Sequence, residues 1–302
     1  MGTPHAAVPS LEKCISGGHL IAAVYTQPDR PSGRGNKITF SPVKECAKQH
    51  GLPVFQPLKL RTPEALSEFR SHDAEVAVVV AYGRVLPESF LNALPHGAIN
   101  LHFSLLPRYR GAAPVNWAIA NGESETGVTT MAMDPGHDTG SILLQKAVQI
   151  YDEETSSDLM ARLSFVGAEL LIETLDNLDI IEPQEQDHPR ATYAPIIKKE
   201  DGQIDWSLTA RQIRDRIRAF QPFPTSYTFF GGARLTLWKG DLAGAVNETP
   251  GTVIVAKGDE FVVACGQGTS IAVSEIQVEG KRRVSVRDFL NGAELNVGVR
   301  LG

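Results

Sequence analysis

The chain has 302 residues, of which 42% are hydrophobic and 21% charged, and its net charge is −6. This length predicts about two domains, and the composition is ordinary for a protein with a hydrophobic core. We find no run of 18 apolar residues and no charged-then-apolar leader, so we expect no membrane or secretory segment and a cytoplasmic location. The three cysteines, Cys14, Cys46 and Cys265, are odd in number and widely spaced, which argues against a disulfide framework and a zinc site, and we expect them to be reduced and unreactive.

Charge is distributed unevenly along the chain. Residues 1–195 hold 15 Lys and Arg against 23 Asp and Glu, whereas residues 196–302 hold 14 against 12. Within the acidic half, residues 29–48 form a basic island. Its five cations, Arg30, Arg34, Lys37, Lys44 and Lys48, face only two acids, Asp29 and Glu45. This asymmetry indicates that the two halves do different work, and the island is a candidate for contacts with phosphates.

The first half alternates apolar runs with polar, helical segments. Residues 20–26 and 75–82 are β-branched apolar runs of the kind buried in a parallel sheet, and residues 41–50 predict a helix between them. Further strands are predicted at residues 99–103, 128–133 and 142–150, and a helix begins near Thr155 or Ser156. We therefore predict an open, doubly wound α/β domain with a mostly parallel sheet over residues 1–182. No glycine-rich nucleotide motif follows its strands, so nothing supports a nucleotide cofactor.

Two polar side chains interrupt the apolar strand predicted at residues 99–103. Because side chains on a strand alternate between faces, Asn100 and His102 project from the same face. Twenty-seven residues after Gly111, the turn at residues 134–140 holds Asp138, whose carboxylate can orient and charge-stabilise an imidazole. An Asn, a His and an Asp that meet at strand ends suit acyl transfer. Taken alone, an Asn-x-His pair on a strand is more often structural than catalytic, and both readings are open on the residues alone.

The second half is predominantly β. Residues 183–204 predict a linker because they contain three prolines and no apolar period. One helix is predicted at residues 208–220. The strands that follow are predicted at residues 227–230, 235–238, 253–255, 261–264 and 271–278. Short strands with glycine turns predict a small, OB-like β-barrel over residues 205–302, an architecture that contacts RNA in other proteins.

Arg211, Arg214 and Arg218 line one side of the helix predicted at residues 208–220. Such a stripe is usually a solvated face. Only Asp215 lies among the three arginines, so the stripe is equally able to contact phosphates.

The motifs around Asn100 and Asp138 resemble those of the formyl transferases that use 10-formyltetrahydrofolate. That family shows Asn-x-His, then a Ser-Leu-Leu-Pro-type loop, then Asp-Thr-Gly, and all three occur here in that order. The resemblance implies that Asn100, His102 and Asp138 are catalytic. It also implies that the folate lies against the loop Ser104, Leu105, Leu106 and Pro107 and the strand end Val80, Ala81 and Tyr82. Folate is then a cosubstrate, and neither a metal nor another cofactor is needed. Without the resemblance, residues 104–107 are an ordinary turn.

Over essentially its whole length the chain resembles one branch of this family, the methionyl-tRNA formyltransferases. Residues 26–37, Thr-Gln-Pro-Asp-Arg-Pro-Ser-Gly-Arg-Gly-Asn-Lys, are similar to the basic loop by which that branch engages the acceptor end of tRNA. Further matches are residues 80–83, 108–114, 204–206, 218–220, 280–281 and 288–290. The resemblance implies formyl transfer to the α-amino group of initiator methionyl-tRNA for translation initiation. The implied tRNA contacts are Arg30, Arg34, Lys37, Arg211, Arg214 and Arg218, and we expect a monomer with no membrane partner.

Three other functions remain as alternatives. Glycinamide ribonucleotide formyltransferases share Asn100, His102 and Asp138 but resemble only the first domain. Sugar-nucleotide formyltransferases have a similar second domain but lack the basic segment from Arg30 to Lys37. A non-catalytic RNA-binding relative would have no need of the three polar residues, and a formyl-transfer assay separates it from the enzymes.

The start of the chain departs from the family pattern. In the methionyl-tRNA formyltransferases a short apolar strand precedes Gly-Thr-Pro, whereas here Met1 stands directly before Gly2. In a doubly wound sheet the first strand is central, so its loss leaves backbone groups on both neighbours unpaired. We expect either that the natural product starts upstream of Met1 or that this form is unstable and poorly active. The alternative is that the neighbouring strands close up and tolerate the loss.

Overall fold

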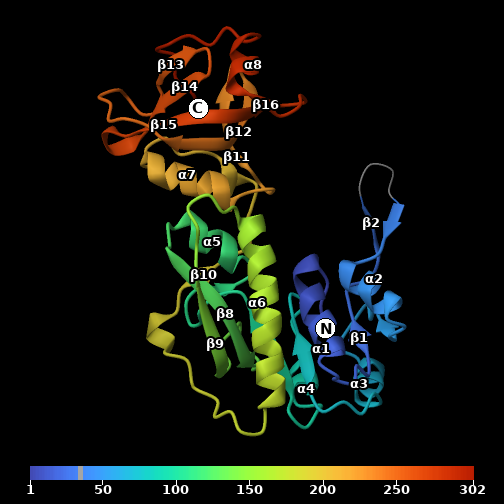
Figure 1. Ribbon diagram of the computed structural model, residues 1–302. Helices are drawn as coiled ribbons and strands as arrows, with labels where there is room; N and C mark the ends of the chain where they lie inside the picture. The colour runs from blue at the N-terminus through green and yellow to red at the C-terminus, as the bar shows by residue number, and fades with distance from the viewer. Residues whose placement is uncertain (33–36) are drawn as a thin grey trace. The chain divides into compact units, whose positions relative to one another are not determined.

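The computed structural model describes residues 1–32 and 37–302, which divide into two compact units (Figure 1). Unit 1 comprises residues 1–114, 125–149 and 160–194, and unit 2 comprises residues 115–124, 150–159 and 195–302. Much of the segment predicted as a linker, residues 183–204, is built into these units. Its first part, up to Ala194, belongs to unit 1, where Ala194 is buried.

Unit 1 is an α/β structure. Its helices are α1 (Val8–Ser16), α2 (Pro42–Gln49), α3 (Pro63–Arg70), α4 (Glu88–Leu91) and most of α6 (Ser156–Asp176). Its strands are β1 (Val24–Tyr25), β2 (Arg30–Ser32), β3 (Lys37–Thr39), β4 (Val54–Phe55), β5 (Ala77–Val79), β6 (Ala98–His102), β7 (Arg110–Gly111), β8 (Glu125–Ala132), β9 (Ile142–Gln149) and β10 (Tyr193–Ala194). The order β5-β6-β8-β9 forms one sheet, in which β5 and β6 are parallel and the other pairs antiparallel. The pairs β1-β4 and β7-β10 are parallel, and β2-β3 is an antiparallel hairpin.

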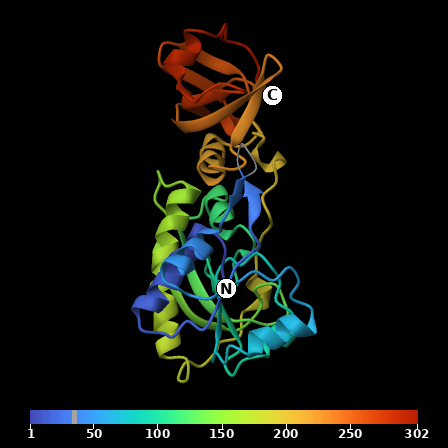
Figure 2. The ribbon, with the colours of Figure 1, turned by 90° about the vertical axis from the view of Figure 1, so that its right-hand side faces the viewer.

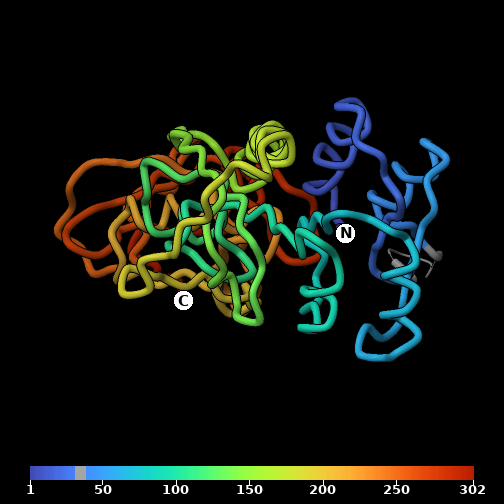
Figure 3. The backbone as a smooth tube through the Cα atoms, turned by 90° about the horizontal axis from the view of Figure 1, so that it is seen from below, coloured from blue at the N-terminus to red at the C-terminus, as the bar shows by residue number. Residues whose placement is uncertain are grey.

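Helix α6 covers one face of the four-stranded sheet, beside β8 and β9 (Figure 1). Its Gly167 lies over Leu101 of β6, where a Cβ atom would come within 2.8 Å of a Leu101 methyl carbon. The Thr174 hydroxyl meets that of Thr130 on β8 at 2.8 Å. Helix α1 runs beside α6, as Figure 2 shows and as the shared apolar cluster of Cys14 and Leu171 confirms. Figure 3 looks along the axis of α6. This packing holds β6 rigidly from its buried face.

Met1 and Gly2 lie between β1 and β5 and pair with both. The Met1 amine donates to the Val78 carbonyl oxygen at 2.6 Å, and the Val80 N–H donates to the Met1 carbonyl oxygen at 2.9 Å. On the other side the Gly2 N–H donates to the Tyr25 carbonyl oxygen at 2.9 Å. Two residues therefore occupy the position that the sequence analysis assigned to a first strand. The strand predicted over residues 20–26 is confined to Val24–Tyr25, the two residues that pair with β4.

An apolar cavity of about 140 Å³ lies beside Met1. Its walls include Ile21 and Ala23 from the β1 side and Val76 and Val78 from the β5 side. Burial lowers the pKa of the Met1 amine from 8.0 to about 6, because the charged form loses its hydration. The amine therefore sits where an uncharged backbone N–H would be more favourable.

Extending the chain at its amino end by five β-branched apolar residues should raise the melting temperature. The added residues would fill the cavity and pair with β1 and β5, and the amine would become an amide. In the unextended chain the Met1 amine has a pKa of 8.0 when the protein is unfolded and of about 6 when it is folded. Between these pH values the unfolded state binds a proton and the folded state does not. Stability should therefore fall by up to about 3 kcal/mol as the pH drops from above 8 to below 6, and the extension should remove that component.

Thermal unfolding across this pH range measures both effects. The control is an extension of the same length made of glycine and serine, which adds an amide but no apolar side chains. Equal melting temperatures for the apolar extension, the polar extension and the original chain would contradict the prediction.

Unit 2 is an antiparallel sheet with short helices. The helices are most of α5 (Pro114–Ala120), α7 (Ala210–Ala219) and α8 (Val286–Leu290). The strands are β11 (Ser226–Phe230), β12 (Ala233–Leu242), β13 (Val253–Lys257), β14 (Glu260–Ala264), β15 (Ser270–Val278) and β16 (Val284–Ser285). They pair in the order β11-β12-β15-β14-β13, with β16 also on β15. The predicted helix and all five predicted strands are confirmed, while closure into an OB-like barrel stays a prediction.

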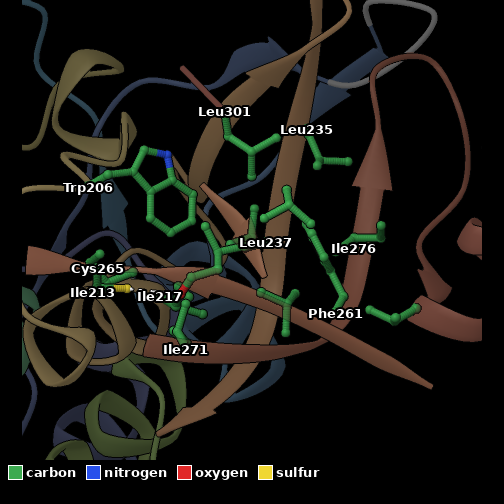
Figure 4. Packing of buried hydrophobic residues seen from close by; sticks show 14 of the residues in the cluster. Trp206, Ile213, Ile217, Leu235, Leu237, Phe261, Cys265, Ile271, Ile276 and Leu301 are labelled. Atoms are coloured by element: carbon green, nitrogen blue, oxygen red, sulfur yellow. Dashed lines mark hydrogen bonds between the residues drawn. The ribbon is translucent and has the colours of Figure 1, made fainter. Parts of the chain in front are cut away.

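The core of unit 2 forms where α7 meets the sheet (Figure 4). Helix α7 begins in a capping box, in which Thr209 and Gln212 bond each other's backbone N–H groups. Its apolar residues Ile213 and Ile217 pack with alternate residues of the strands, such as Leu235 and Leu237 of β12. Alternation along β12 is what gives the sheet one buried face.

The three cysteines are free and buried. Burial raises the pKa of Cys14 to about 11 and that of Cys265 to about 12, so neither forms the reactive thiolate near neutral pH. Across residues 1–32 and 37–302, no helix is both long enough and apolar enough to span a membrane.

Candidate active site at the carboxyl end of strand β6

Strand β6 carries Asn100 and His102 on the same face, as the alternation of the sequence predicts. The register of the parallel pair sets Val79 of β5 beside Asn100, so the residues that follow β5 lie beside the carboxyl end of β6. Among the residues that the structure describes, no hydrogen bond occupies the Asn100 side chain, which is partly exposed. Its amide is free to donate to a ligand.

The His102 ring is buried, with 6% of the residue exposed. Its Nε2 lies 2.9 Å from the main-chain oxygen of Tyr109. Because a carbonyl oxygen only accepts, Nε2 carries the hydrogen, and in the neutral ring Nδ1 is then the free acceptor. Nδ1 faces Asp138 Oδ2 at 3.8 Å, which is too long for a hydrogen bond but close enough for ion pairing once Nδ1 is protonated.

Asp138 comes from the turn at residues 134–140, which the structure brings to His102. Its backbone has φ +54°, in the left-handed region that costs a non-glycine residue about 1 kcal/mol or more. The Gly111 N–H donates to Asp138 Oδ2 at 2.8 Å and fixes the carboxylate. Asp134 shapes the start of the turn, because its Oδ1 accepts from the Gly136 N–H at 3.0 Å and from the Thr139 hydroxyl at 2.7 Å.

Gly111 is required by the space around it as well as by its backbone angle. Its φ is +119°, and a Cβ atom there would come within 2.6 Å of the Ala194 carbonyl oxygen on β10. Strand β10 pairs with β7, so the close approach cannot relax without breaking that pair. The glycine therefore lets one chain segment contact both β10 and Asp138.

The loop predicted to bind folate, residues 104–107, packs largely inward. The Ser104 hydroxyl donates to the Arg108 carbonyl oxygen at 2.7 Å and closes the turn, and Leu106 is buried. Leu105 packs on Gly127 of β8, and Pro107 is partly exposed. The loop is a rigid wall, and the Ser104 hydroxyl already has a partner.

The second predicted folate segment, residues 80–82, follows β5. Val80 and Tyr82 are buried, and the Tyr82 ring belongs to the apolar core of unit 1, where burial raises its pKa. Ala81 between them is exposed, with φ +46°. The Tyr82 carbonyl oxygen accepts from the Thr3 hydroxyl and from Gln27, which fix the segment. At this position only the backbone and Ala81 can face a ligand.

The basic segment forms the hairpin β2-β3. Arg30 is exposed at its start, and the backbone of Lys37 pairs with that of Ser32. Arg34 lies outside the described residues. Just after the hairpin, Lys44 binds Asp29 and also stands 4.1 Å from the centre of the Phe40 ring. Asp29 and the Phe40 ring thus engage the cation of Lys44 within the protein.

Two of the three helix arginines are engaged in ion pairs inside unit 2, which makes them less available to phosphates than the sequence predicted. The Arg214 side chain, 9% exposed, binds Glu153 at 2.8 Å. Arg218 binds the buried Asp215 at 2.8 Å and the carbonyl oxygen of Glu154 at 2.8 Å. Arg211 is 59% exposed and lies 3.9 Å from the exposed carboxylate of Asp152, so it is the most accessible of the three arginines.

Sequence reasoning missed four residues that shape the site. The main chain of Tyr109 orients His102, the main chain of Gly111 holds Asp138, and Arg110 and Gln186 support the Asp138 loop from within. Residues 108–111 belong to a motif that matches the family, but the motif alone assigned them no function. Gln186 lay in the polar segment predicted as a linker, and no local pattern marked it.

Comparisons with known sequences cover both units. Residues 1–175 match the family described as "Formyl transferase", and residues 196–294 match "Formyl transferase, C-terminal domain". The chain is 47% identical to the methionyl-tRNA formyltransferase of Geobacter metallireducens, over 100% of this chain and 97% of that protein. It is also 47% identical to the enzyme of that name from Caldanaerobacter subterraneus subsp. tengcongensis, over 100% of this chain and 98% of that protein.

Solved structures share the fold at lower identity. An N-formyltransferase from Helicobacter canadensis, in complex with folinic acid and dTDP-3-aminofucose, has a TM-score of 0.67 and 21% identity, covering 90% of this chain and 96% of that chain. HypX from Aquifex aeolicus, in complex with tetrahydrofolic acid, has a TM-score of 0.58 and 14% identity, covering 83% of this chain and 47% of that chain. At these identities the likeness concerns the fold.

Replacing Gly111 with alanine should destabilise unit 1 by about 2 kcal/mol or more. The new Cβ atom would clash with the Ala194 carbonyl, and alanine at φ +119° is strained. The measurement is thermal unfolding, and we expect a melting temperature several degrees lower. Gly244→Ala is the control, because no heavy atom lies within 4 Å of a Cβ atom there. The same melting temperature for both variants would contradict the prediction and show that β10 can shift to accommodate the new Cβ atom.

Proposed function

The chain belongs to the methionyl-tRNA formyltransferases, and we propose that Asn100, His102 and Asp138 are its catalytic residues. The enzyme transfers a formyl group to the α-amino group of methionyl-tRNA, the step that prepares the initiator for translation. The observation that carries the site is the position of His102. Its Nδ1 faces Asp138 at 3.8 Å, on the strand face that also presents the free amide of Asn100.

Transfer requires that the α-amine attack the formyl carbon of 10-formyltetrahydrofolate. A bond forms between the amine nitrogen and the formyl carbon, and the bond from that carbon to folate N10 breaks. Negative charge develops on the formyl oxygen during the attack. The Asn100 amide, held on a strand whose other face packs under α6, is a preorganised donor to that oxygen.

The attacking amine must also lose a proton, and folate N10 must gain one. His102 Nδ1 is the free acceptor of the ring, since Nε2–H is committed to the Tyr109 carbonyl. Proton uptake at Nδ1 produces an imidazolium 3.8 Å from Asp138, whose carboxylate is held by Gly111 and stabilises the charge. The ring then returns the proton towards N10, which leaves His102 ready for the next turnover.

The folate binds, in this proposal, between the loop Ser104–Pro107 and the segment Val80–Tyr82. Both lie beside the carboxyl end of β6, and ligands of open α/β sheets bind beyond the carboxyl ends of parallel strands. The inward packing of Ser104 and Tyr82 assigns contact to main-chain groups and to Ala81 rather than to these two side chains. The loop thus shapes the pocket as a wall.

The tRNA contacts proposed are Arg30, Arg34 and Lys37 of the basic segment and Arg211 of α7. Arg214 and Arg218 are left out because their charges are bound by Glu153 and Asp215. We further propose that the sheet of unit 2 closes as an OB-like barrel and contributes to tRNA binding. A cytoplasmic monomer completes the proposal.

The variants Asn100→Ala, His102→Ala and Asp138→Ala should each lower kcat by about 100-fold or more, since one lost transition-state contact costs about 3 kcal/mol. Their Kd for methionyl-tRNA should stay close to that of the parent. The assay follows formyl transfer from 10-formyltetrahydrofolate to methionyl-tRNA, with glycinamide ribonucleotide and an amino-sugar nucleotide as competing acceptors. His137→Ala, an exposed change in the same turn, is the matched control. Near-normal turnover by folded His102→Ala would remove the histidine from the mechanism.

Affinity for tRNA should fall steeply with salt, because phosphate contacts release counterions. Arg34→Gln or Lys37→Gln should flatten the slope of log K against log salt by roughly 0.7 to 0.9 and leave the Kd for folate unchanged. Filter binding over a salt series measures this. Lys13→Gln, an exposed lysine of α1 outside the hairpin, serves as the control. A salt-independent affinity in the parent would overturn the phosphate contacts.

A further inference from the structure

Gln186 connects a buried arginine to the turn that carries Asp138. Arg110 donates from Nε and Nη2 to Gln186 Oε1, at 3.0 and 2.7 Å. Gln186 Nε2 in turn donates to the main-chain oxygens of Asp138 and Gly140, at 2.9 and 2.7 Å. Arg110 and Gln186 are each 3% exposed. Both ends of the amide are therefore hydrogen-bonded, and water has little access to compete.

The chemistry of the partners fixes the orientation of this amide. A guanidinium only donates hydrogen bonds, so it faces the oxygen Oε1. Carbonyl oxygens only accept, so they face the nitrogen Nε2. Turning the amide over would set N–H groups against Arg110 and an oxygen against two carbonyls. Gln186 thus has one satisfactory arrangement, and only an amide supplies it.

The charge of Arg110 strengthens the connection. Among the residues that the structure describes, no carboxylate lies within ion-pair distance of its guanidinium, and its other side-chain partner is the ring of His188, at 3.0 Å. The positive charge therefore acts mainly on Gln186 Oε1. A charged donor makes a stronger hydrogen bond, and polarisation through the amide strengthens the bonds that Nε2 donates.

The bonds from Gln186 fall on the part of the turn that sets the direction of Asp138. The carbonyls of Asp138 and Gly140 flank Thr139, so both peptide units are held from the same side. Asp138 has φ +54°, a conformation that persists only when its surroundings impose it. Its carboxylate then reaches the Gly111 N–H and faces His102. Within the part of the chain that the structure describes, Gln186 supplies the hydrogen bonds to both of these carbonyls.

We propose that Gln186 is a positioning residue for formyl transfer, acting through the turn at residues 138–140 to hold the Asp138 carboxylate beside His102. The proposal rests on the catalytic role of Asp138 proposed above. Gln186 itself touches neither substrate. Displacement of a catalytic group by about 1 Å costs up to about 100-fold in rate, so the loss should fall on kcat.

The variant Gln186→Glu separates positioning from folding. Glutamate has the shape of glutamine and gains an ion pair with Arg110, but its second oxygen opposes the carbonyls of Asp138 and Gly140. We expect kcat to fall by about 10- to 100-fold, with KM for methionyl-tRNA and for folate within about threefold of the parent. Gln184→Glu is the matched control: it makes the same change of charge two residues away, at an exposed side chain, and should keep the parental kcat.

The same substitution in an Asp138→Asn background tests the route of the effect. If Gln186 acts through the carboxylate, Gln186→Glu should lower kcat much less in that background than in the parent. An equal fold loss in both backgrounds, or parental kcat in folded Gln186→Glu, overturns the proposal. Should Gln186→Glu not fold, Gln186→Met removes the bonds without adding charge, and the same comparison applies. Parental kcat in the single variant Asp138→Asn would instead overturn the catalytic role of Asp138. The single variant therefore separates failure of that role from failure of the Gln186 proposal.

Discussion

The buried imidazole of His102 is the constraint on which the arrangement of unit 1 depends. A polar ring with so little access to water is costly unless its N–H is bonded, and the bond is supplied by the main chain of Tyr109. To bring that carbonyl back over β6, the chain must reverse within seven residues. The Ser104 hydroxyl closes the reversal, and Tyr109 adopts φ +58°. The inward-packed loop at residues 104–107 follows from this one requirement.

The reversal also determines how the Asp138 carboxylate is held. Directly after Tyr109, the chain forms β7, a strand of two residues that pairs with β10 on one side. On the other side the Gly111 N–H holds Asp138. One short strand thus connects the turn that orients the imidazole with the turn that supplies the carboxylate. His102 and Asp138 can keep their separation because they are fixed to main-chain groups only two positions apart, the Tyr109 carbonyl and the Gly111 N–H.

Local patterns predicted where the candidate site residues lie, and their catalytic role stays a prediction. Asn100 and His102 stand two positions apart on a strand, and alternation alone places them on one face. Asp138 lies in a glycine-rich turn, where its carboxylate is outside the sheet and able to reach a neighbouring strand end. The helices at residues 42–49 and 156–176 and the strands of unit 2 follow from apolar periodicity in the same way. Each of these features is encoded in one continuous segment of the chain.

What the sequence did not predict depends on residues far apart. Gln186 reaches a turn 46 to 48 residues earlier, so its polar neighbourhood looked like a linker. Arg214 pairs with Glu153, 61 positions away, and the helix stripe alone did not reveal that partner. The lengths of β1 and β5 were overestimated because a strand ends where its partner ends, and partners are not visible in an apolar run.

The arginines show why a count of charges is a weak guide to a nucleic-acid surface. A cation is more available to phosphates when it is exposed and its contacts with the protein's own acids are weak. In α7 this favours Arg211, whose contact with Asp152 is long and at the surface, over the buried Arg214 and Arg218. Arg110 is the converse case: it is buried, no carboxylate of the described residues pairs with it, and its charge is directed to an uncharged amide. A carboxylate in place of that amide would neutralise the arginine but would leave two carbonyls of the Asp138 turn without donors. An amide at this position therefore serves the site better than a carboxylate would. It leaves the charge of Arg110 unneutralised, but it donates the hydrogen bonds that hold the Asp138 turn beside His102.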